Sequence, residues 1–125
     1  MQSTRTLDMQ TLVAHYLQAF NETDADRRLG LLESLYAHDC TYTDPHVDLH
    51  AADQIDGFIA QTQERFPGFI FKLGGPIDAH HNQARFQWRA GPAEAPDTYG
   101  GFDVIVTKDD RISNVYGFAD AAPEA

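Results

Sequence analysis

The sequence places an acidic residue in the middle of an apolar run, and this residue is the strongest candidate for chemistry. Asp103 lies in the run from Gly101 to Val106, where the residues around it are apolar. On a strand, Asp103 would share a face with Gly101 and Ile105, and we expect both faces to be covered. An unpaired ionised carboxylate is costly in such a place. Asp103 is therefore expected to be neutral, paired with a base or bonded to several donors, as a structural residue or as a proton-holding group in a pocket.

Two further residues could take part in acid–base chemistry. Asp44 stands before Pro45, a pair that commonly ends a strand in a turn. The hydroxyl of Tyr16 is the one polar group on the apolar stripe of a predicted helix. The simpler interpretation is a core tyrosine whose hydroxyl has a hydrogen-bond partner. Neither residue indicates a function alone. Taken together with Asp103, the phenol and the two carboxyl groups favour acid–base catalysis, because these groups donate and accept protons.

Other polar clusters allow competing interpretations. Segment 44–50 alternates Asp, His, Asp and His, which would suit a divalent metal if extended, although Pro45 favours a loop that faces water. Adjacent His80 and His81 would face opposite sides of a strand and could not chelate together. Arg85 and Arg89 share a face that is solvated, forms a dimer contact, clamps the carboxylate of a substrate, or supplies a charge partner for Asp103. We predict no metal site.

The elements that would position these residues follow from hydrophobic periodicity. Apolar residues recur at helical spacing in the segments 9–20, 24–36 and 55–66. Asp24 is the expected cap of the second helix, and Pro67-Gly68 closes the third. Strand patterns occupy the segments 40–44, 69–73, 77–81, 84–89, 99–107 and 112–118, with a hairpin turn at 108–111. This order predicts an α+β fold in which helices cover one face of a single curved antiparallel sheet.

Length, charge and cysteine content disfavour several classes of function. A chain of 125 residues fits one domain, residues 1–125, with enough core for a pocket. Its net charge of −10 disfavours nucleic acid, membrane surfaces and, unless an arginine lines the site, anionic substrates. Cys40 is the only cysteine, so no intrachain disulfide or thiolate metal cluster can form. The sequence shows no signal-peptide core and no apolar run of about 18 residues, and we expect a cytoplasmic protein.

The order of elements and several local motifs resemble the nuclear transport factor 2-like superfamily. This superfamily includes the SnoaL-like polyketide cyclases and the ketosteroid isomerases. The motifs that carry the resemblance are LVAHYLQAFNETDAD, LYAHDCTYTDP, QIDGFIAQTQERFPG, GGFDVIVTKDDRI and NVYGFAD. The resemblance covers residues 12–118 and implies a cone, in which a bent sheet and three N-terminal helices surround one open-ended apolar pocket.

The resemblance also implies roles for the three acid–base residues. Ketosteroid isomerases use a tyrosine on the first helix, an aspartate before proline and an aspartate in the long strand, which match Tyr16, Asp44 and Asp103. By this resemblance Asp44 would be the base that moves a proton between carbons next to a carbonyl. Tyr16 and protonated Asp103 would donate hydrogen bonds to the enolate oxygen.

Departures from the isomerase pattern point away from a steroid. Ile59 replaces a supporting tyrosine of the third helix, and Ala119 stands where some isomerases place a large aromatic residue. We predict a cofactor-free SnoaL-like protein that acts on a small, mostly apolar carbonyl or enol compound. A non-catalytic binding module and a dimeric interaction domain remain the alternatives. A homodimer through Tyr116 and Phe118 is expected. The expected ligand-binding residues are Tyr36, Tyr42, Phe58, His81, Arg85 and Trp88.

Overall fold

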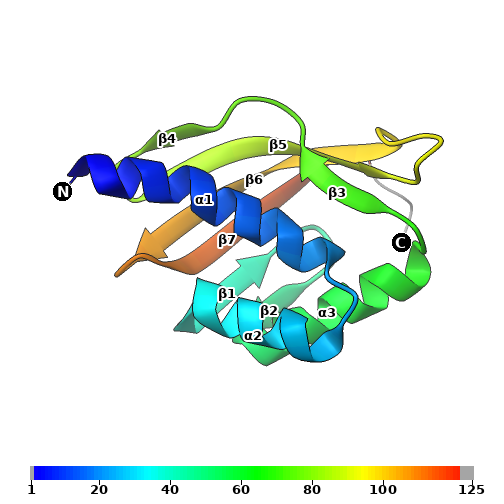
Figure 1. Cartoon of the computed structure of the whole chain (residues 1–125), viewed down its shortest axis with the longest axis horizontal. Helices are drawn as coiled ribbons and strands as arrows, with labels where there is room; N and C mark the ends of the chain where they lie inside the picture. The colour runs from blue at the N-terminus through cyan, green and yellow to red at the C-terminus, as the bar shows by residue number, and fades with distance from the viewer. Residues whose placement is uncertain (1, 122–125) are drawn as a thin grey trace.

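The computed structural model describes the backbone of residues 2–121 and the side chains of residues 9–120, and Figure 1 labels its elements. Within this range the chain forms the helices α1 (Gln2–Asn21), α2 (Ala25–Leu35) and α3 (Ala52–Arg65). The strands are β1 (Tyr36–Thr43), β2 (Asp48–His50), β3 (Ile70–Leu73), β4 (Asp78–His80), β5 (Gln83–Gly91), β6 (Tyr99–Lys108) and β7 (Arg111–Ala121). The expected α+β class is confirmed.

The strands join one sheet in the order β2-β1-β7-β6-β5-β3, with β4 paired to β5. Most neighbouring strands are antiparallel, but β1 runs parallel to β7, with Tyr42 opposite Val115. The sheet is therefore mixed, which corrects the expectation of a wholly antiparallel sheet. A parallel pair requires a long crossover connection, and the chain from β2 through α3 to β6 supplies it.

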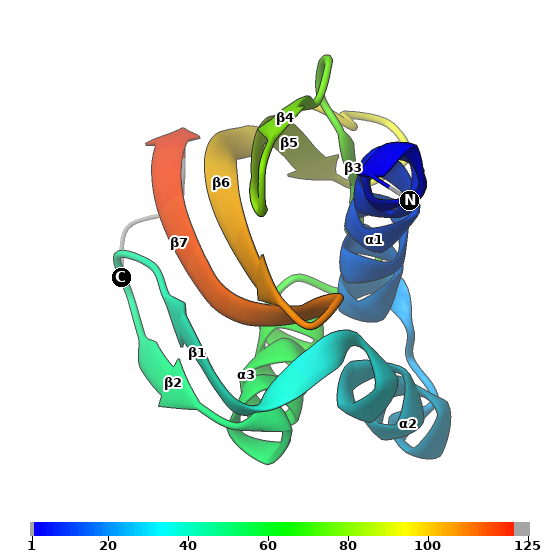
Figure 2. The same cartoon turned by 90° about the vertical axis from the view of Figure 1, so that its left-hand side faces the viewer.

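The sheet bends around an interior that the helices close, so the expected cone is confirmed. In Figure 2, β5, β6 and β7 curve around one side of this interior, while α1 lies on the other side and α3 lies across the bottom. Buried apolar side chains from all three helices meet the inner face of the sheet, and burying each of them stabilises the fold by about 2 kcal/mol. The helices contribute Val13, Leu17, Leu32, Leu35, Ile55 and Ile59 to this core, and the sheet contributes Ile105, Ile112 and Val115.

Short-range hydrogen bonds and backbone conformation fix the ends of the elements. Asp24 caps α2 as expected, because its Oδ1 accepts from the backbone N–H groups of Asp26 at 3.0 Å and Arg27 at 3.2 Å. Between β6 and β7, Asp109 and Asp110 have φ values of 54° and 66°. Two positive φ angles match the twist of a two-residue hairpin, so the expected turn at 108–111 is confirmed.

A buried arginine joins the helices to one another. The Nε of Arg28 in α2 donates to Oδ1 of Asp56 in α3 at 2.6 Å. Its Nη1 donates to the backbone carbonyl of Glu22 at 2.9 Å and to the side chain of Gln63 at 3.1 Å. This network connects the end of α1, α2 and α3, and it holds α3 in place across the interior.

The outer face of the sheet is only partly covered. Phe102, Val104 and Val106 of β6 are half-buried, so a single chain covers the outer face of this strand only in part. On β7, the exposed fractions of Tyr116 and Phe118 are 42% and 51%. Phe118 stacks on Phe102 with 5.1 Å between ring centroids. We call these five residues the outer aromatic face.

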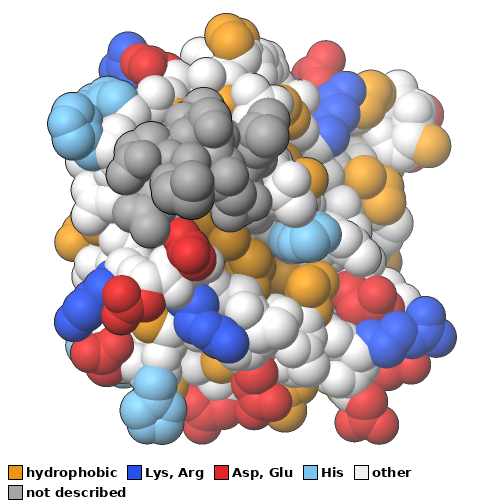
Figure 3. Space-filling model, turned by 60° about the vertical axis from the view of Figure 1, so that its left-hand side comes forward, with side chains coloured by type: hydrophobic (Ala, Val, Ile, Leu, Met, Phe, Trp, Pro, Cys, Tyr) orange, Lys and Arg blue, Asp and Glu red, His pale blue; other side chains and the backbone are white. Residues whose placement is uncertain are grey.

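Apolar side chains are also exposed on β3, where the exposed fractions of Ile70 and Leu73 are 54% and 41%. On the face shown in Figure 3, acidic side chains are spread widely, in keeping with the net charge of −10. No helix in the part of the chain that the structure describes is long and apolar enough to cross a membrane.

Candidate functional site

The site is built around Asp103, which lies on the inner face of β6. Its strand neighbours are Phe86 on β5 and Gly117 on β7. Only 6% of Asp103 is exposed. Its Oδ2 accepts a hydrogen bond of 2.6 Å from the hydroxyl of Tyr16, which α1 places 87 residues away in the sequence. The helix and the long strand therefore bring an acid and a phenol together in the interior.

Burial governs the protonation of this pair. It raises the pKa of Asp103 to about 7, and the nearby Asp44 carboxylate raises this pKa too, while hydrogen bonds from Tyr16 and Trp88 lower it. Burial and the Asp103 charge together raise the pKa of Tyr16 well above its usual value. Near neutral pH, Asp103 can therefore hold or release a proton, and Tyr16 stays a neutral hydrogen-bond donor.

Asp44 follows the end of β1 and is half-buried. Its Oδ1 accepts from the backbone N–H groups of His46 at 2.8 Å and Val47 at 3.1 Å. Its Oδ2 accepts from the hydroxyl of Tyr42 at 3.0 Å. Pro45 ends the strand, and the turn behind it folds two amides back onto the carboxylate. These three bonds orient Asp44 at the edge of the same interior space.

Gly117 separates the two carboxyl groups. A Cβ atom at this position would lie 2.9 Å from Oδ1 of Asp103 and 3.1 Å from Cβ of Asp44. Any side chain at residue 117 would occupy the space into which both acids project. Residue 117 must be glycine because Asp103 and Asp44 both lie close to its Cα atom and leave no room for a side chain.

Asp103, Tyr16 and Asp44 line an open pocket with a volume of about 210 Å³. Most of its wall is apolar and aromatic, and it includes Phe20, Tyr42, Phe58, Phe71, Trp88 and Tyr99. This volume is below the roughly 300–1,000 Å³ of pockets that hold drug-sized ligands. The pocket therefore suits a small molecule with an apolar body.

The structure brings six of the nine predicted site residues to this pocket. They are Tyr16, Tyr42, Asp44, Phe58, Trp88 and Asp103. Tyr36 is buried but does not line the pocket, and its hydroxyl has no hydrogen-bond partner in the described part of the chain. Burial raises the pKa of Tyr36 well above its usual value. The structure therefore places Tyr36 in the core and not in the wall of this pocket.

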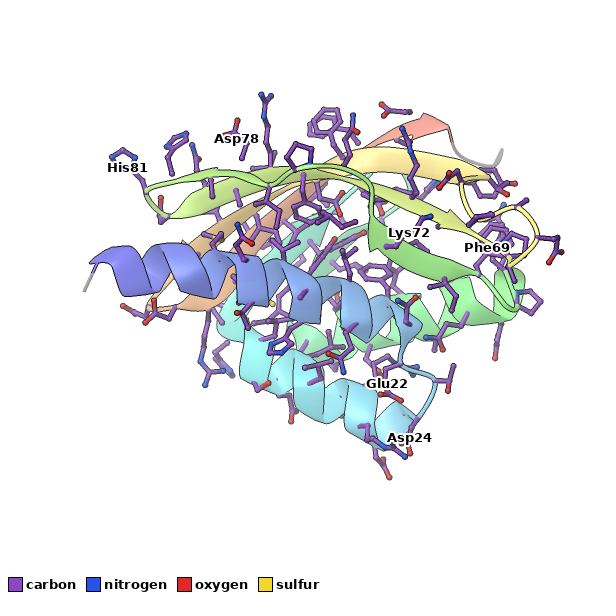
Figure 4. The ribbon with its side chains drawn as sticks, turned by 45° about the horizontal axis from the view of Figure 1, so that its top comes forward. Glu22, Asp24, Phe69, Lys72, Asp78 and His81 are labelled. Atoms are coloured by element: carbon purple, nitrogen blue, oxygen red, sulfur yellow. The ribbon has the colours of Figure 1, made fainter. Side chains whose placement is uncertain are left out.

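His81 and Arg85, which were predicted to bind a ligand, do not line this pocket. Ala84 and Phe86 on β5 point inward, so Arg85 between them faces solvent, where its Nε lies 3.2 Å from Oδ2 of Asp78. His81 sits at the tip of the turn between β4 and β5 and projects away from the molecule (Figure 4).

The two adjacent histidines also differ from expectation. His81 leaves the strand with a φ of 54°, and its Nδ1 lies 3.1 Å from Nδ1 of His80. The interpretation that their rings face opposite sides is therefore wrong, because it assumed that both residues continue a regular strand. Their contact lies on the exposed surface, away from the pocket.

Segment 44–50 does not gather its acidic and imidazole groups. Nε2 of His50 lies 4.0 Å from Oδ1 of Asp48, while Asp44 is turned toward the pocket. Among the side chains of residues 9–120, no three His, Cys, Asp or Glu residues lie together as a metal site would require.

The sequence interpretation missed one side of the pocket. Gln61, Thr62 and Arg65 of α3 line it together with Phe66 and Phe69. A signal was present, because residues 58, 61, 62 and 65 follow the i, i+3, i+4, i+7 spacing of one helix face. The helix was predicted from its apolar residues, and the polar residues on the same face were not assigned to the pocket.

A curved sheet and three helices that enclose an apolar pocket define the cone-shaped class of nuclear transport factor 2-like proteins. The SnoaL-like domain family matches residues 13–115, and the chain belongs to this family. A proposed isomerase of the SnoaL-like family from Agrobacterium tumefaciens strain C58 is 35% identical and has a TM-score of 0.87. That similarity covers 92% of this chain and 99% of the other. No curated protein matches the chain.

More distant structures share the fold alone. A proposed ketosteroid isomerase from Kribbella flavida DSM 17836 is 17% identical, with a TM-score of 0.65 over 94% of this chain and 82% of the other. A proposed SnoaL-like polyketide cyclase from Jannaschia sp. CCS1 is 14% identical, with a TM-score of 0.67 over 89% and 86% of the two chains.

Proposed function

We propose that this protein catalyses a proton shift on a small, mostly apolar carbonyl or enol compound, using only its own side chains. The observation that carries the proposal is the placement of Asp44 and Asp103 on either side of Gly117, with Tyr16 bonded to Asp103. A reaction of this kind needs one ionised carboxyl group and one neutral carboxyl group at the same pH. The half-buried Asp44 and the buried Asp103 suit these two states.

The proposed reaction assigns one role to each group. Asp44 removes a proton from a carbon next to the carbonyl, and the electron pair moves onto the carbonyl oxygen to form an enolate. Protonated Asp103 donates a hydrogen bond to that oxygen, and Tyr16 turns its O–H from Asp103 to donate a second one. Asp44 then returns its proton to a different carbon as the carbonyl re-forms. Donors that the fold already holds beside this oxygen stabilise the developing charge, because little more than the Tyr16 O–H must rotate during the reaction.

Two further features support this reaction. Most of the pocket wall is apolar and aromatic, and electrostatic stabilisation is stronger in apolar surroundings than in water. The relative from Agrobacterium tumefaciens is named as a proposed isomerase, which is the same reaction class. The small pocket volume favours a substrate smaller than a steroid, in agreement with the departures at Ile59 and Ala119.

Isomerisation of cyclohex-3-enone to its conjugated isomer, followed by ultraviolet absorbance, tests the proposal. Wild type should accelerate the reaction above the buffer rate. Asp44→Asn should lower the enzymatic rate by about 100-fold or more, because it removes the base. Asp48→Asn is the matched control, since this exposed carboxyl lies four residues away and bonds to Thr43. Equal rates for wild type and Asp44→Asn would refute the catalytic role and leave a non-catalytic binding module.

We also propose that the protein is a cytoplasmic homodimer that pairs through the outer aromatic face. Exposed aromatic side chains on a sheet favour association, because contact removes apolar area from water. Tyr116 and Phe118 lie at the centre of this face, next to the stacked Phe102. A two-fold contact would place the same face of both copies together, so that each contact between two different residues occurs twice.

A further inference from the structure

Charge is distributed unevenly along the pocket. Asp44 and Asp103 meet beside Gly117, at what we call the inner end. Among the described residues that line the pocket, Arg65 is the single arginine, and no lysine lines it. Arg65 is the last residue of α3. A ligand in this pocket therefore meets acidic groups at one place and a permanent positive charge at another.

Arg65 belongs to an aromatic part of the wall. Its guanidinium carbon lies 5.1 Å from the centroid of the Phe66 ring, a cation–π contact. Phe66 in turn contacts Phe69 at 5.2 Å and Tyr99 at 5.8 Å between ring centroids. All four residues line the pocket, and we call them the outer end. In Figure 4, Phe69 lies where α3 ends, at the opposite end of the molecule from His81.

The two ends are separated by the length of a small two-ring compound. Tyr99 opens β6, and Asp103 follows four residues later on the same strand. At the strand rise of about 3.3 Å per residue, their backbones are roughly 13 Å apart. The side chains of both ends project into the pocket and shorten this span. A rigid ligand of about 10 Å could contact both ends at once.

We propose that the ligand carries a carboxylate, which Arg65 binds at the outer end, while its carbonyl or enol group meets Tyr16 and Asp103 at the inner end. This assignment rests on the function proposed above for the inner end. Guanidinium matches a carboxylate through paired N–H donors. The Asp44 carboxylate repels a second anion, so the ligand can enter in one orientation only. The net charge of −10 otherwise disfavours anions, and Arg65 is the pocket group that offsets it.

Binding of 6-hydroxy-2-naphthoate and of its neutral carboxamide tests the proposal. The two probes have the same rings and the same hydroxyl group and differ in charge at the far end. Calorimetry gives their dissociation constants at pH 6. The single indole N–H resonance of the protein reports occupancy of the pocket, because Trp88 is the only tryptophan and lines the wall.

Wild type should bind the carboxylate roughly three- to tenfold more tightly than the carboxamide, as expected for a charge-assisted bond at a partly exposed arginine. Arg65→Gln should abolish this preference, and Arg65→Lys should keep part of it. Arg27→Gln is the matched control, because it removes the same charge from an exposed site on α2. Equal binding of the two probes by wild type, an unchanged preference in Arg65→Gln, or no binding of either probe would overturn the proposal.

The cyclohexenone assay keeps this test separate from the proposed function. That substrate has no carboxylate, so its isomerisation by wild type tests the inner end without involving the charge of Arg65. Isomerisation by wild type with no preference of wild type for the carboxylate probe would refute the role of Arg65 alone. Absent isomerisation together with an Arg65-dependent preference would refute the proposed reaction and leave the carboxylate site standing.

Discussion

Protonation of Asp103 should make the stability of the fold depend on pH in a defined direction. Burial raises its pKa in the folded state to about 7, against 3.8 in a model peptide. Between these two values the folded protein binds more protons than the unfolded chain does. The free energy of unfolding must therefore fall as the pH rises through this window. The full loss above pH 8 is about 4 kcal/mol, and about 3 kcal/mol of it occurs between pH 5 and pH 8.

Asp103→Asn isolates this contribution. Asparagine cannot ionise, and its side-chain oxygen can still accept the hydrogen bond from Tyr16. The difference in unfolding free energy between Asp103→Asn and wild type should shift by about 3 kcal/mol in favour of the variant when the pH rises from 5 to 8. Urea unfolding at several pH values measures this difference. The other acidic groups are present in both proteins, so their titration cancels.

Asp48→Asn provides the control for this experiment. Asp48 is exposed on β2, and its replacement should leave the pH profile parallel to that of wild type. Parallel profiles for Asp103→Asn and wild type would refute the argument. That result would mean that water or a positive charge reaches Asp103 and keeps it ionised at little cost.

Two other substitutions test separate parts of the structure. Gly117→Ala would place a methyl group 2.9 Å from the Asp103 carboxyl, so it should lower cyclohexenone isomerisation by at least about tenfold, whereas Gly30→Ala, with no atom within 4 Å of the added carbon, should not. An unchanged rate in Gly117→Ala would show that the two acids need not approach each other. Val104→Lys combined with Tyr116→Lys should convert the proposed dimer to a monomer in light scattering, and a monomeric wild type would contradict the dimer.

Local patterns in the sequence predicted much of the fold. Alternation in β6 correctly put Asp103 and Ile105 on the same face, because a strand has a fixed period of two. The cap at Asp24 and the turn at 108–111 also followed from nearest-neighbour chemistry. The family resemblance directed attention to Tyr16, whose bond to Asp103 spans 87 residues.

Features that depend on distant contacts were not predictable in this way. The parallel pairing of β1 with β7 cannot be predicted from the sequence of either strand alone. Tyr36 fits the helical spacing of α2 but opens β1, because its side chain completes the core beneath the sheet. His81 adopts a left-handed conformation that the residue type does not announce. In the sequence, Arg65 looks like an ordinary solvent-facing charge at the end of a helix. Its place in the pocket depends on Phe66, Phe69 and Tyr99, which the fold brings beside it.

The parallel pairing of β1 with β7 has a consequence for the order of folding. Residues joined across this pair, such as Thr41 and Asn114, are 73 positions apart, so their meeting closes a long loop at a large entropic cost. Asp44 directly follows β1, and Gly117 lies on β7. Helices and hairpins can form early, but Asp44 and Asp103 cannot come together until β1 pairs with β7. Catalytic competence should therefore emerge last during refolding, in step with the slowest structural phase.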